Sequence, residues 1–155
     1  MERHTGSSIP QAAGPGADRF TMTDTVFTRI VRREIPAAIV FEDTQVIAFM
    51  DAGQVNPGHV LVATKRQVET LMELDEAEAA HLFAVAHRIA KAVQAAFQPE
   101  GMTLLQTNKP AGWQTVPHVH VHVLPRYAND GADLIWPRRE PGLDVLREYA
   151  GRIRL

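Results

Sequence analysis

The chain has 155 residues and 45% hydrophobic content, which is enough for one compact domain that buries roughly two-thirds of its unfolded surface. Its net charge of −2 favours a small ligand over nucleic acid or an anionic membrane surface. The absence of cysteine excludes disulfides, thiolate nucleophiles and cysteine-rich zinc sites. Because there is no signal-peptide pattern and no apolar run of membrane-spanning length, we expect a cytoplasmic protein.

The order of apolar runs and turn residues predicts an α+β domain. Residues 1–21 are rich in Gly, Pro, Ser and Ala, so we predict a disordered tail there and a single domain over residues 22–155. The predicted elements are a short helix over 26–31 behind an Asp24 cap, strands over 39–42, 46–50, 59–64, 102–107 and 117–125, a long helix over 75–97 and a last helix over 143–153. Antiparallel strands with these helices make a layered α+β structure.

The sharpest signal is a stretch between Pro117 and Pro125 in which His118, His120 and His122 alternate with valines. Strict alternation is the period of a β-strand, so the histidines share one face and the valines point to the other. We assign the valine face to the core. The imidazoles then form a row that can contact an extended polar ligand.

Two other interpretations of this row remain open. His120 and His122, at i and i+2, can share a zinc ion if a third ligand comes from elsewhere, and His59 is the best candidate. Alternatively, the row is a ladder of solvated histidines on a half-exposed strand. His81 and His87 lie inside the predicted long helix, where we expect no role in the site.

Residues 114–126 resemble the signature of the histidine triad (HIT) superfamily of nucleotide hydrolases and transferases, and residues 51–62, with their Pro-Gly-His core, resemble its second block. The resemblance implies a HIT-type fold of about five antiparallel strands with a short N-terminal, a long central and a C-terminal helix. It also implies a homodimer that binds a purine nucleotide and needs no cofactor. The signature leans toward the Fhit-like diadenosine polyphosphate branch, whereas the terminal helices resemble bacterial Hint-like proteins.

A neutral imidazole is a competent nucleophile at phosphorus and afterwards a good leaving group. The resemblance implies that His120 attacks the α-phosphorus and forms a nucleotidyl-histidine intermediate, which water or another acceptor resolves. His122 would contact phosphate oxygens, His59 would orient the triad, and His118 would support it through hydrogen bonds. Nucleoside phosphoramidates, acyl adenylates and dinucleoside polyphosphates are the expected substrates. The alternatives are a purine nucleotide-binding module without turnover and a metal-dependent hydrolase.

The resemblance also implies a set of nucleotide-binding residues. Asp51 would hold the ribose hydroxyls, with Ala52 beside it, and Asn108, Gln114 and Thr115 would reach the phosphate and the leaving-group oxygen. A carboxylate has about four acceptor sites, which suits two vicinal hydroxyls. Asp is also a common turn residue, so ordinary loop polarity is the competing interpretation for these positions.

Trp113 departs from the family pattern, which usually has glycine directly before the glutamine. A backbone N–H approaches phosphate most easily when the residue has no side chain. Trp113 either caps the site by stacking on a base or packs on the surface.

Overall fold

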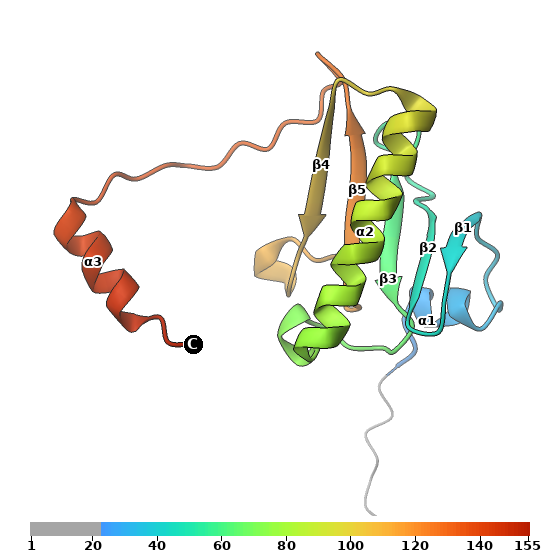
Figure 1. Ribbon diagram of the computed structural model, residues 1–155, viewed down its shortest axis with the longest axis horizontal. Helices are drawn as coiled ribbons and strands as arrows, with labels where there is room; N and C mark the ends of the chain where they lie inside the picture. The colour runs from blue at the N-terminus through green and yellow to red at the C-terminus, as the bar shows by residue number, and fades with distance from the viewer. Residues whose placement is uncertain (1–22) are drawn as a thin grey trace, which may run out of the picture.

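One sheet of five antiparallel strands organises residues 23–155, the part of the chain that the computed structural model describes (Figure 1). The elements are α1 (Val26–Val31), β1 (Ile39–Glu42), β2 (Val46–Met50), β3 (Val60–Thr64), η1 (Leu71–Glu73), α2 (Glu76–Phe97), β4 (Gly101–Gln106), η2 (Pro110–Gly112), β5 (His120–Arg126) and α3 (Leu143–Arg152). The strand order is β1-β2-β3-β5-β4, with every neighbouring pair antiparallel. The predicted α+β class is confirmed, while the predicted tail lies outside the described residues.

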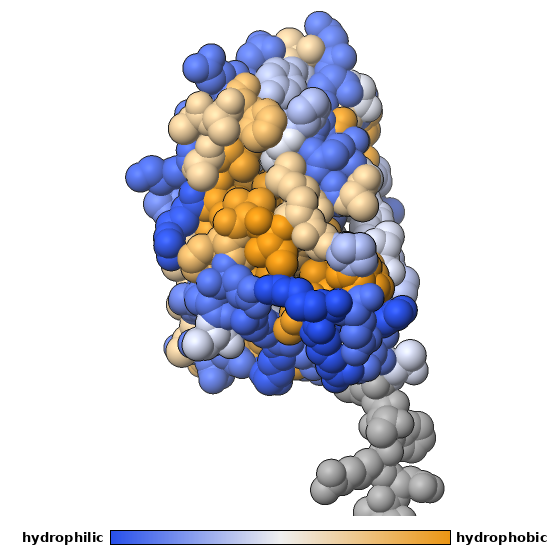
Figure 2. Space-filling view, turned by 90° about the vertical axis from the view of Figure 1, so that its right-hand side faces the viewer, coloured by the Kyte–Doolittle hydropathy of each residue, from blue (hydrophilic) through white to orange (hydrophobic). Residues whose placement is uncertain are grey.

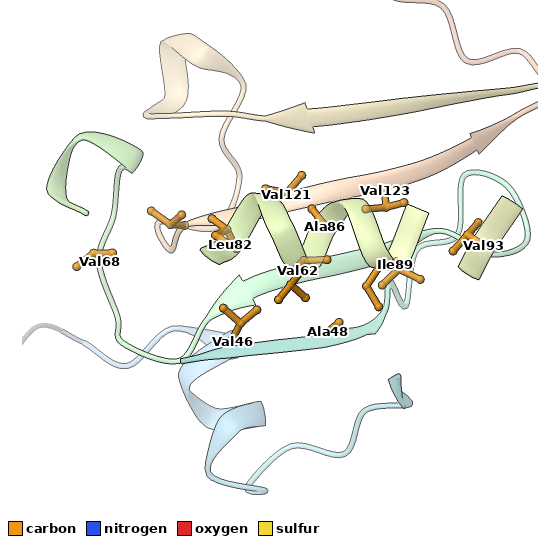
Figure 3. Close-up of a cluster of buried hydrophobic side chains, with 13 residues drawn as sticks. Val46, Ala48, Val62, Val68, Leu82, Ala86, Ile89, Val93, Val121 and Val123 are labelled. Atoms are coloured by element: carbon orange, nitrogen blue, oxygen red, sulfur yellow. The ribbon is translucent and has the colours of Figure 1, made fainter. Parts of the chain in front are cut away.

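The valine face of the histidine strand forms the main core. Val119, Val121 and Val123 are fully buried, and Val121 pairs with Val62 of β3 on one side and Gln106 of β4 on the other. Figure 3 shows Val121 and Val123 beside α2, together with side chains of β2 and β3. The assignment of the valines to the core is therefore correct.

The long helix α2 is fixed at its N-terminus and along one face. Asp75 accepts a hydrogen bond from the N–H of Glu78 at 2.8 Å, and the Glu78 carboxylate accepts one from the N–H of Asp75 at 3.0 Å. This capping box satisfies two amide groups that the helix itself leaves unpaired. The buried positions recur at helical spacing and face the sheet: Leu82, Val85, Ala86, Ile89 and Val93. Burial stabilises each larger apolar side chain of this set by about 1.5–3 kcal/mol.

The opposite face of the sheet is covered in part by α1. Phe27 and Ile30 pack against buried side chains of β2 and β3. The helix occurs as predicted, but its cap is Thr25, whose Oγ1 accepts from the N–H of Thr28 at 3.2 Å. Asp24, the predicted cap, is paired with Arg32 instead. Because α1 lies on the face that carries the histidines, it forms one wall beside them.

The strands β3 and β5 both begin later than predicted. The N–H of His59 donates to the carbonyl of Asn56 at 3.2 Å, and the N–H of His118 donates to the carbonyl of Val116 at 2.8 Å. Each of these backbone N–H groups is therefore used in a turn and not in the sheet ladder. As a result, His59 and His118 stand just before their strands, at opposite ends of the histidine face.

The last predicted helix is present as α3, at the end of an extended segment that carries it away from the sheet (Figure 1). None of its residues is buried. Within residues 23–155, no helix combines the length and the apolar character that crossing a membrane requires.

Candidate active site

His120 is held in one tautomer by its own strand. Its Nδ1 lies 2.6 Å from the backbone carbonyl oxygen of His118. A carbonyl can only accept, so Nδ1 carries the hydrogen and donates it. The other ring nitrogen, Nε2, then has a lone pair, and within residues 23–155 it has no hydrogen-bond partner and is not sealed from solvent. His120 therefore presents a nucleophilic nitrogen.

His122, His59 and Asp51 form a chain of polar side chains next to His120. The His59 Nε2 and the His122 Nδ1 are 3.0 Å apart, and the Asp51 Oδ2 lies 3.5 Å from the same His59 nitrogen. The N–H of Val55 points at the His59 Nδ1 from 3.5 Å, so that nitrogen accepts and the His59 hydrogen sits on Nε2. His122 consequently accepts at Nδ1 and presents an N–H at Nε2. The ring centres of His120 and His122 are 4.9 Å apart.

Burial keeps these imidazoles neutral. It lowers the pKa of His59, of His118 and of His120 below the ordinary value near 6.5. For His122, burial and then the repulsion between protonated rings at His122, His120 and His59 lower the pKa to about 4. Near pH 7 the cluster therefore offers lone pairs and neutral N–H donors, as a histidine nucleophile requires.

His118 has a different position from the other two triad members. It is fully buried, its Nε2–H donates to the carbonyl of Thr64 at 2.7 Å, and its Nδ1 accepts from the hydroxyl of Thr25 at 2.7 Å. The Phe27 ring lies edge-on to it, with ring centres 5.6 Å apart. The expectation of three imidazoles facing a ligand is therefore wrong for His118, because α1 and β3 use both of its ring nitrogens.

A cavity of about 430 Å³, here called the α1 cavity, opens between α1 and the ends of β2 and β3. Its apolar walls include Phe27, Ile30, Phe49 and Leu61, and Asp51 and Ala52 stand at its edge. Figure 2 shows hydrophobic side chains gathered on the side of the molecule where β1 ends the sheet. The Phe27 ring meets His120 edge-on, with ring centres 4.9 Å apart, so this cavity borders the nucleophilic imidazole.

A second cavity of about 300 Å³, here called the β4–β5 cavity, lies beyond His122. Its lining includes His59, His122, Asp51, Leu105, Leu124 and Leu134. Asp51 lines both cavities, so the two meet at the end of β2. A ligand that spans them contacts His122 and lies near His120, whose ring centre is 4.9 Å from those of Phe27 and His122.

Comparison with known proteins accounts for this arrangement. Residues 32–129 match the family model of the HIT domain. This chain belongs to the HIT family. It is 38% identical over 112 residues to "Protein hit" of Bacillus subtilis, covering 72% of this chain and 77% of that protein.

Solved structures of the HIT family have the same fold. A HIT family protein from Bacillus anthracis superposes with a TM-score of 0.80 at 35% identity, covering 84% of this chain and 95% of that one. A histidine triad nucleotide-binding protein from Sulfolobus tokodaii superposes with a TM-score of 0.64 at 29% identity, covering 79% and 84%. Membership places the chain in a superfamily of nucleotide-binding proteins and nucleotide hydrolases.

In this HIT protein, three of the predicted nucleotide-binding residues lie outside the lining of both cavities. The Gln114 amide accepts from the N–H of Lys109 at 2.8 Å and donates to the carbonyl of Glu69 at 2.6 Å. The Asn108 Oδ1 accepts from the N–H of Leu71 at 2.7 Å. Both amides thus hold loops together, while Thr115 is exposed on the loop before the histidines. Asp51 and Ala52, by contrast, stand beside the histidine cluster.

In the folded HIT domain, the residues that could bind a metal ion together differ from the predicted set. Ligand atoms of Asp51, His59 and His122 lie within 4.8 Å of one another, so Asp51 takes the place predicted for His120. A shared zinc ion needs lone pairs on both facing histidine nitrogens, whereas a hydrogen bond needs a hydrogen on one of them. The 3.0 Å separation of the His59 and His122 nitrogens fits the hydrogen bond. The interpretation as a solvated ladder is wrong, because His118 and His120 are buried.

Sequence reasoning missed the residues that support the HIT cluster from other elements. Phe27 packs on two triad imidazoles, and Thr25 bonds to His118 across 93 positions of sequence. Asn56 donates to the carbonyl of Pro125 and to Asp130, both at 2.8 Å, which ties the loop before His59 to the end of β5. No local motif marks these contacts. The helix predicted over residues 26–31 contains Phe27, but its local sequence does not indicate the histidine partners of this ring.

Proposed function

We propose that this HIT protein cleaves purine nucleotide derivatives at the α-phosphate through a covalent intermediate on the Nε2 of His120. The observation that supports this most directly is the hydrogen bond from the His120 Nδ1 to the His118 carbonyl, which leaves the lone pair on Nε2. The neutral state of the buried ring keeps that lone pair available near pH 7.

The proposed reaction has two half-reactions. First, the His120 Nε2 forms a bond to phosphorus, and the bond to the leaving group breaks with its electron pair on the leaving group. An amine leaving group also takes a proton from water, whereas a carboxylate or polyphosphate leaves as an anion. Next, a water oxygen bonds to phosphorus and gives its proton to solvent, and the phosphorus–nitrogen bond breaks to restore the lone pair of His120.

The supporting residues have separate tasks in this proposal. The N–H at the His122 Nε2 donates to a non-bridging phosphate oxygen, where negative charge develops in the transition state. His59, bonded to the His122 Nδ1 at 3.0 Å, fixes the tautomer that makes this donation possible. Thr115, exposed on the neighbouring loop, contributes a phosphate contact, and the side-chain amides of Asn108 and Gln114 hold that loop in position.

The nucleoside occupies the α1 cavity. The aromatic and aliphatic walls, including Phe27 and Phe49, suit a flat purine base, and the Asp51 carboxylate at the edge suits the vicinal ribose hydroxyls. Ala52 lies beside Asp51 and leaves room for the sugar. This orientation brings the α-phosphate toward His120 and His122, because Phe27 of the α1 cavity contacts His120 and because His122 lines the β4–β5 cavity.

A homodimer is the assembly we propose for this protein. Its support is the exposure of Phe83 and Phe97 on α2 and of Leu104 on the edge strand β4. A second copy of the chain would bury these side chains, because apolar burial drives association.

The nucleophile is tested by replacing His120 with asparagine, which keeps a polar group but removes the attacking nitrogen. With an adenosine phosphoramidate as substrate, we expect kcat/KM to fall by roughly 10⁴-fold or more, since loss of a covalent nucleophile removes the main pathway. His87→Asn, an exposed position on α2, is the matched control and should keep wild-type activity. Mass spectrometry of the quenched wild-type reaction should find the nucleotidyl group on His120. An adduct elsewhere, or binding without turnover, contradicts the proposal.

A further inference from the structure

We propose that the β4–β5 cavity receives the leaving group of the reaction and selects leaving groups that carry an apolar side chain and no negative charge. This inference rests on the proposed function, because it takes the reacting phosphorus to lie at His120. It adds a second binding site with a chemical preference of its own. That preference favours amine leaving groups over polyphosphates.

The position of the β4–β5 cavity is the first support. The ring centre of His120 lies 4.9 Å from that of Phe27, which lines the α1 cavity, and 4.9 Å from that of His122, which lines the β4–β5 cavity. The β4–β5 cavity begins at His122 and His59. A nucleoside in the α1 cavity and a phosphorus at His120 therefore direct the remaining substituent toward the β4–β5 cavity.

The walls of the cavity are the second support. Leu105 of β4, Leu124 of β5, Val55 of the loop before His59 and Leu134 of the C-terminal segment surround it. Its volume of about 300 Å³ lies at the small end of the range for ligand sites. Apolar walls of this kind gain free energy from a hydrocarbon side chain and give none to a hydrated, charged one.

Charge is the third support, and it argues against an anionic leaving group. Arg126 is the one basic residue in the lining formed by residues 23–155, and its guanidinium is already occupied. Its Nε and Nη2 donate to Asp130 at 2.7 and 3.0 Å, and its Nη1 donates to the Thr103 hydroxyl at 3.2 Å. Asp51 and Asp133 also line the cavity. Because Asp130 compensates the charge of Arg126, the two lining carboxylates repel a polyphosphate or a carboxylate.

Asp130 fixes the turn after β5 and so holds the outer wall of the cavity in place. Its carboxylate accepts from the N–H groups of Tyr127 at 3.1 Å and Ala132 at 3.0 Å, and from the Asn56 amide at 2.8 Å. The hydrogen bond from Arg126, followed by these backbone donors, holds the pKa of Asp130 far below its ordinary value, so it stays charged. This network holds the turn that brings Ala132, Asp133 and Leu134 to the wall of the cavity.

The test uses three substrates that share one nucleoside and differ only in the leaving group. They are adenosine 5′-phosphoramidate and its N-(2-phenylethyl) and N-(2-carboxyethyl) derivatives. With wild-type protein we expect kcat/KM for the phenylethyl compound to exceed that for the carboxyethyl compound by roughly 10-fold or more, as apolar pockets discriminate on that scale. Two variants, each with a matched control, then test whether this preference arises in the β4–β5 cavity.

Leu134→Asn removes part of the apolar wall and should lower the phenylethyl-to-carboxyethyl ratio severalfold. Asp133→Lys reverses a charge and should lower the same ratio by raising turnover of the carboxyethyl compound. The controls are Leu143→Asn and Asp144→Lys, exposed positions of the same residue types on α3, which should leave the ratio at its wild-type value.

The outcomes separate the two proposals. Turnover of all three substrates with a ratio near one, or a ratio that neither Leu134→Asn nor Asp133→Lys changes, overturns the leaving-group site and leaves the histidine mechanism intact. A wild-type protein that turns over none of the three and forms no adduct on His120 overturns the proposed function, and the leaving-group site with it.

Discussion

The two faces of the sheet are both formed by alternating residues of the strands, but helices cover them to different extents. On the α2 face, the valines of β5 pack against a 22-residue helix whose buried positions form the main core. On the histidine face, the six-residue helix α1 covers only part of the sheet and leaves the α1 cavity and the β4–β5 cavity on either side of the histidines. A long partner helix therefore makes a core, and a short one leaves room for chemistry.

The largest effect on stability is expected from a truncation on the α2 face. Leu82→Ala removes a fully buried side chain of α2 and should lower the free energy of unfolding by about 2–5 kcal/mol. Urea denaturation monitored by circular dichroism measures it. Leu146→Ala, at an exposed position on α3, is the control and should cost much less. Equal losses for the two variants would show that the α2 face does not dominate stability.

On the histidine face, protonation of His122 should lower the free energy of unfolding, by less than the truncation of Leu82 does. The folded-state pKa of His122 is about 4, below its unfolded value near 6.5, so the folded protein binds fewer protons. The stability linked to this group is complete above pH 6.5 and is lost as the pH falls toward 4, by at most about 3 kcal/mol. His122→Asn should flatten this part of the curve of unfolding free energy against pH. If the slope of unfolding free energy against pH were unchanged in the variant, the pH dependence could not be assigned to His122.

The smallest of the three effects concerns the contact between α1 and the histidine face. Thr25→Val keeps the shape of the side chain but removes the hydroxyl that bonds to His118 and caps α1. The buried Nδ1 of His118 then lacks a donor, which should cost about 1–3 kcal/mol. Thr25→Ser keeps the hydroxyl and should stay close to the wild type. Thermal unfolding of both variants compares them, and a Ser variant as unstable as Val would assign the effect to packing.

Local pattern was enough to predict much of the fold. Alternation placed the valines in the core, the strands over residues 39–42 and 46–50 occur as predicted, and the long helix predicted over residues 75–97 is α2. These features depend on neighbours within a few residues, and such interactions are visible in a sequence. The family resemblance added the grouping of Asp51 with the histidines, which the folded chain brings together.

The features that could not be predicted depend on contacts between distant segments. Thr25 replaces Asp24 as the cap of α1 because its hydroxyl also meets His118, far along the chain. The Gln114 amide serves the loop at Lys109 and Glu69, a use that no spacing rule reveals. The division of the histidine face into two cavities follows from the length of α1 and the course of the chain after Asp130.

The main-chain position of the acceptor for His120 has a further consequence. Every amino acid at position 118 brings the same peptide oxygen, so exchanging that side chain cannot by itself switch the tautomer of the reactive ring. Substitutions can loosen the packing around His120. The hydrogen on its Nδ1, however, is held by a backbone carbonyl, which no single codon change removes.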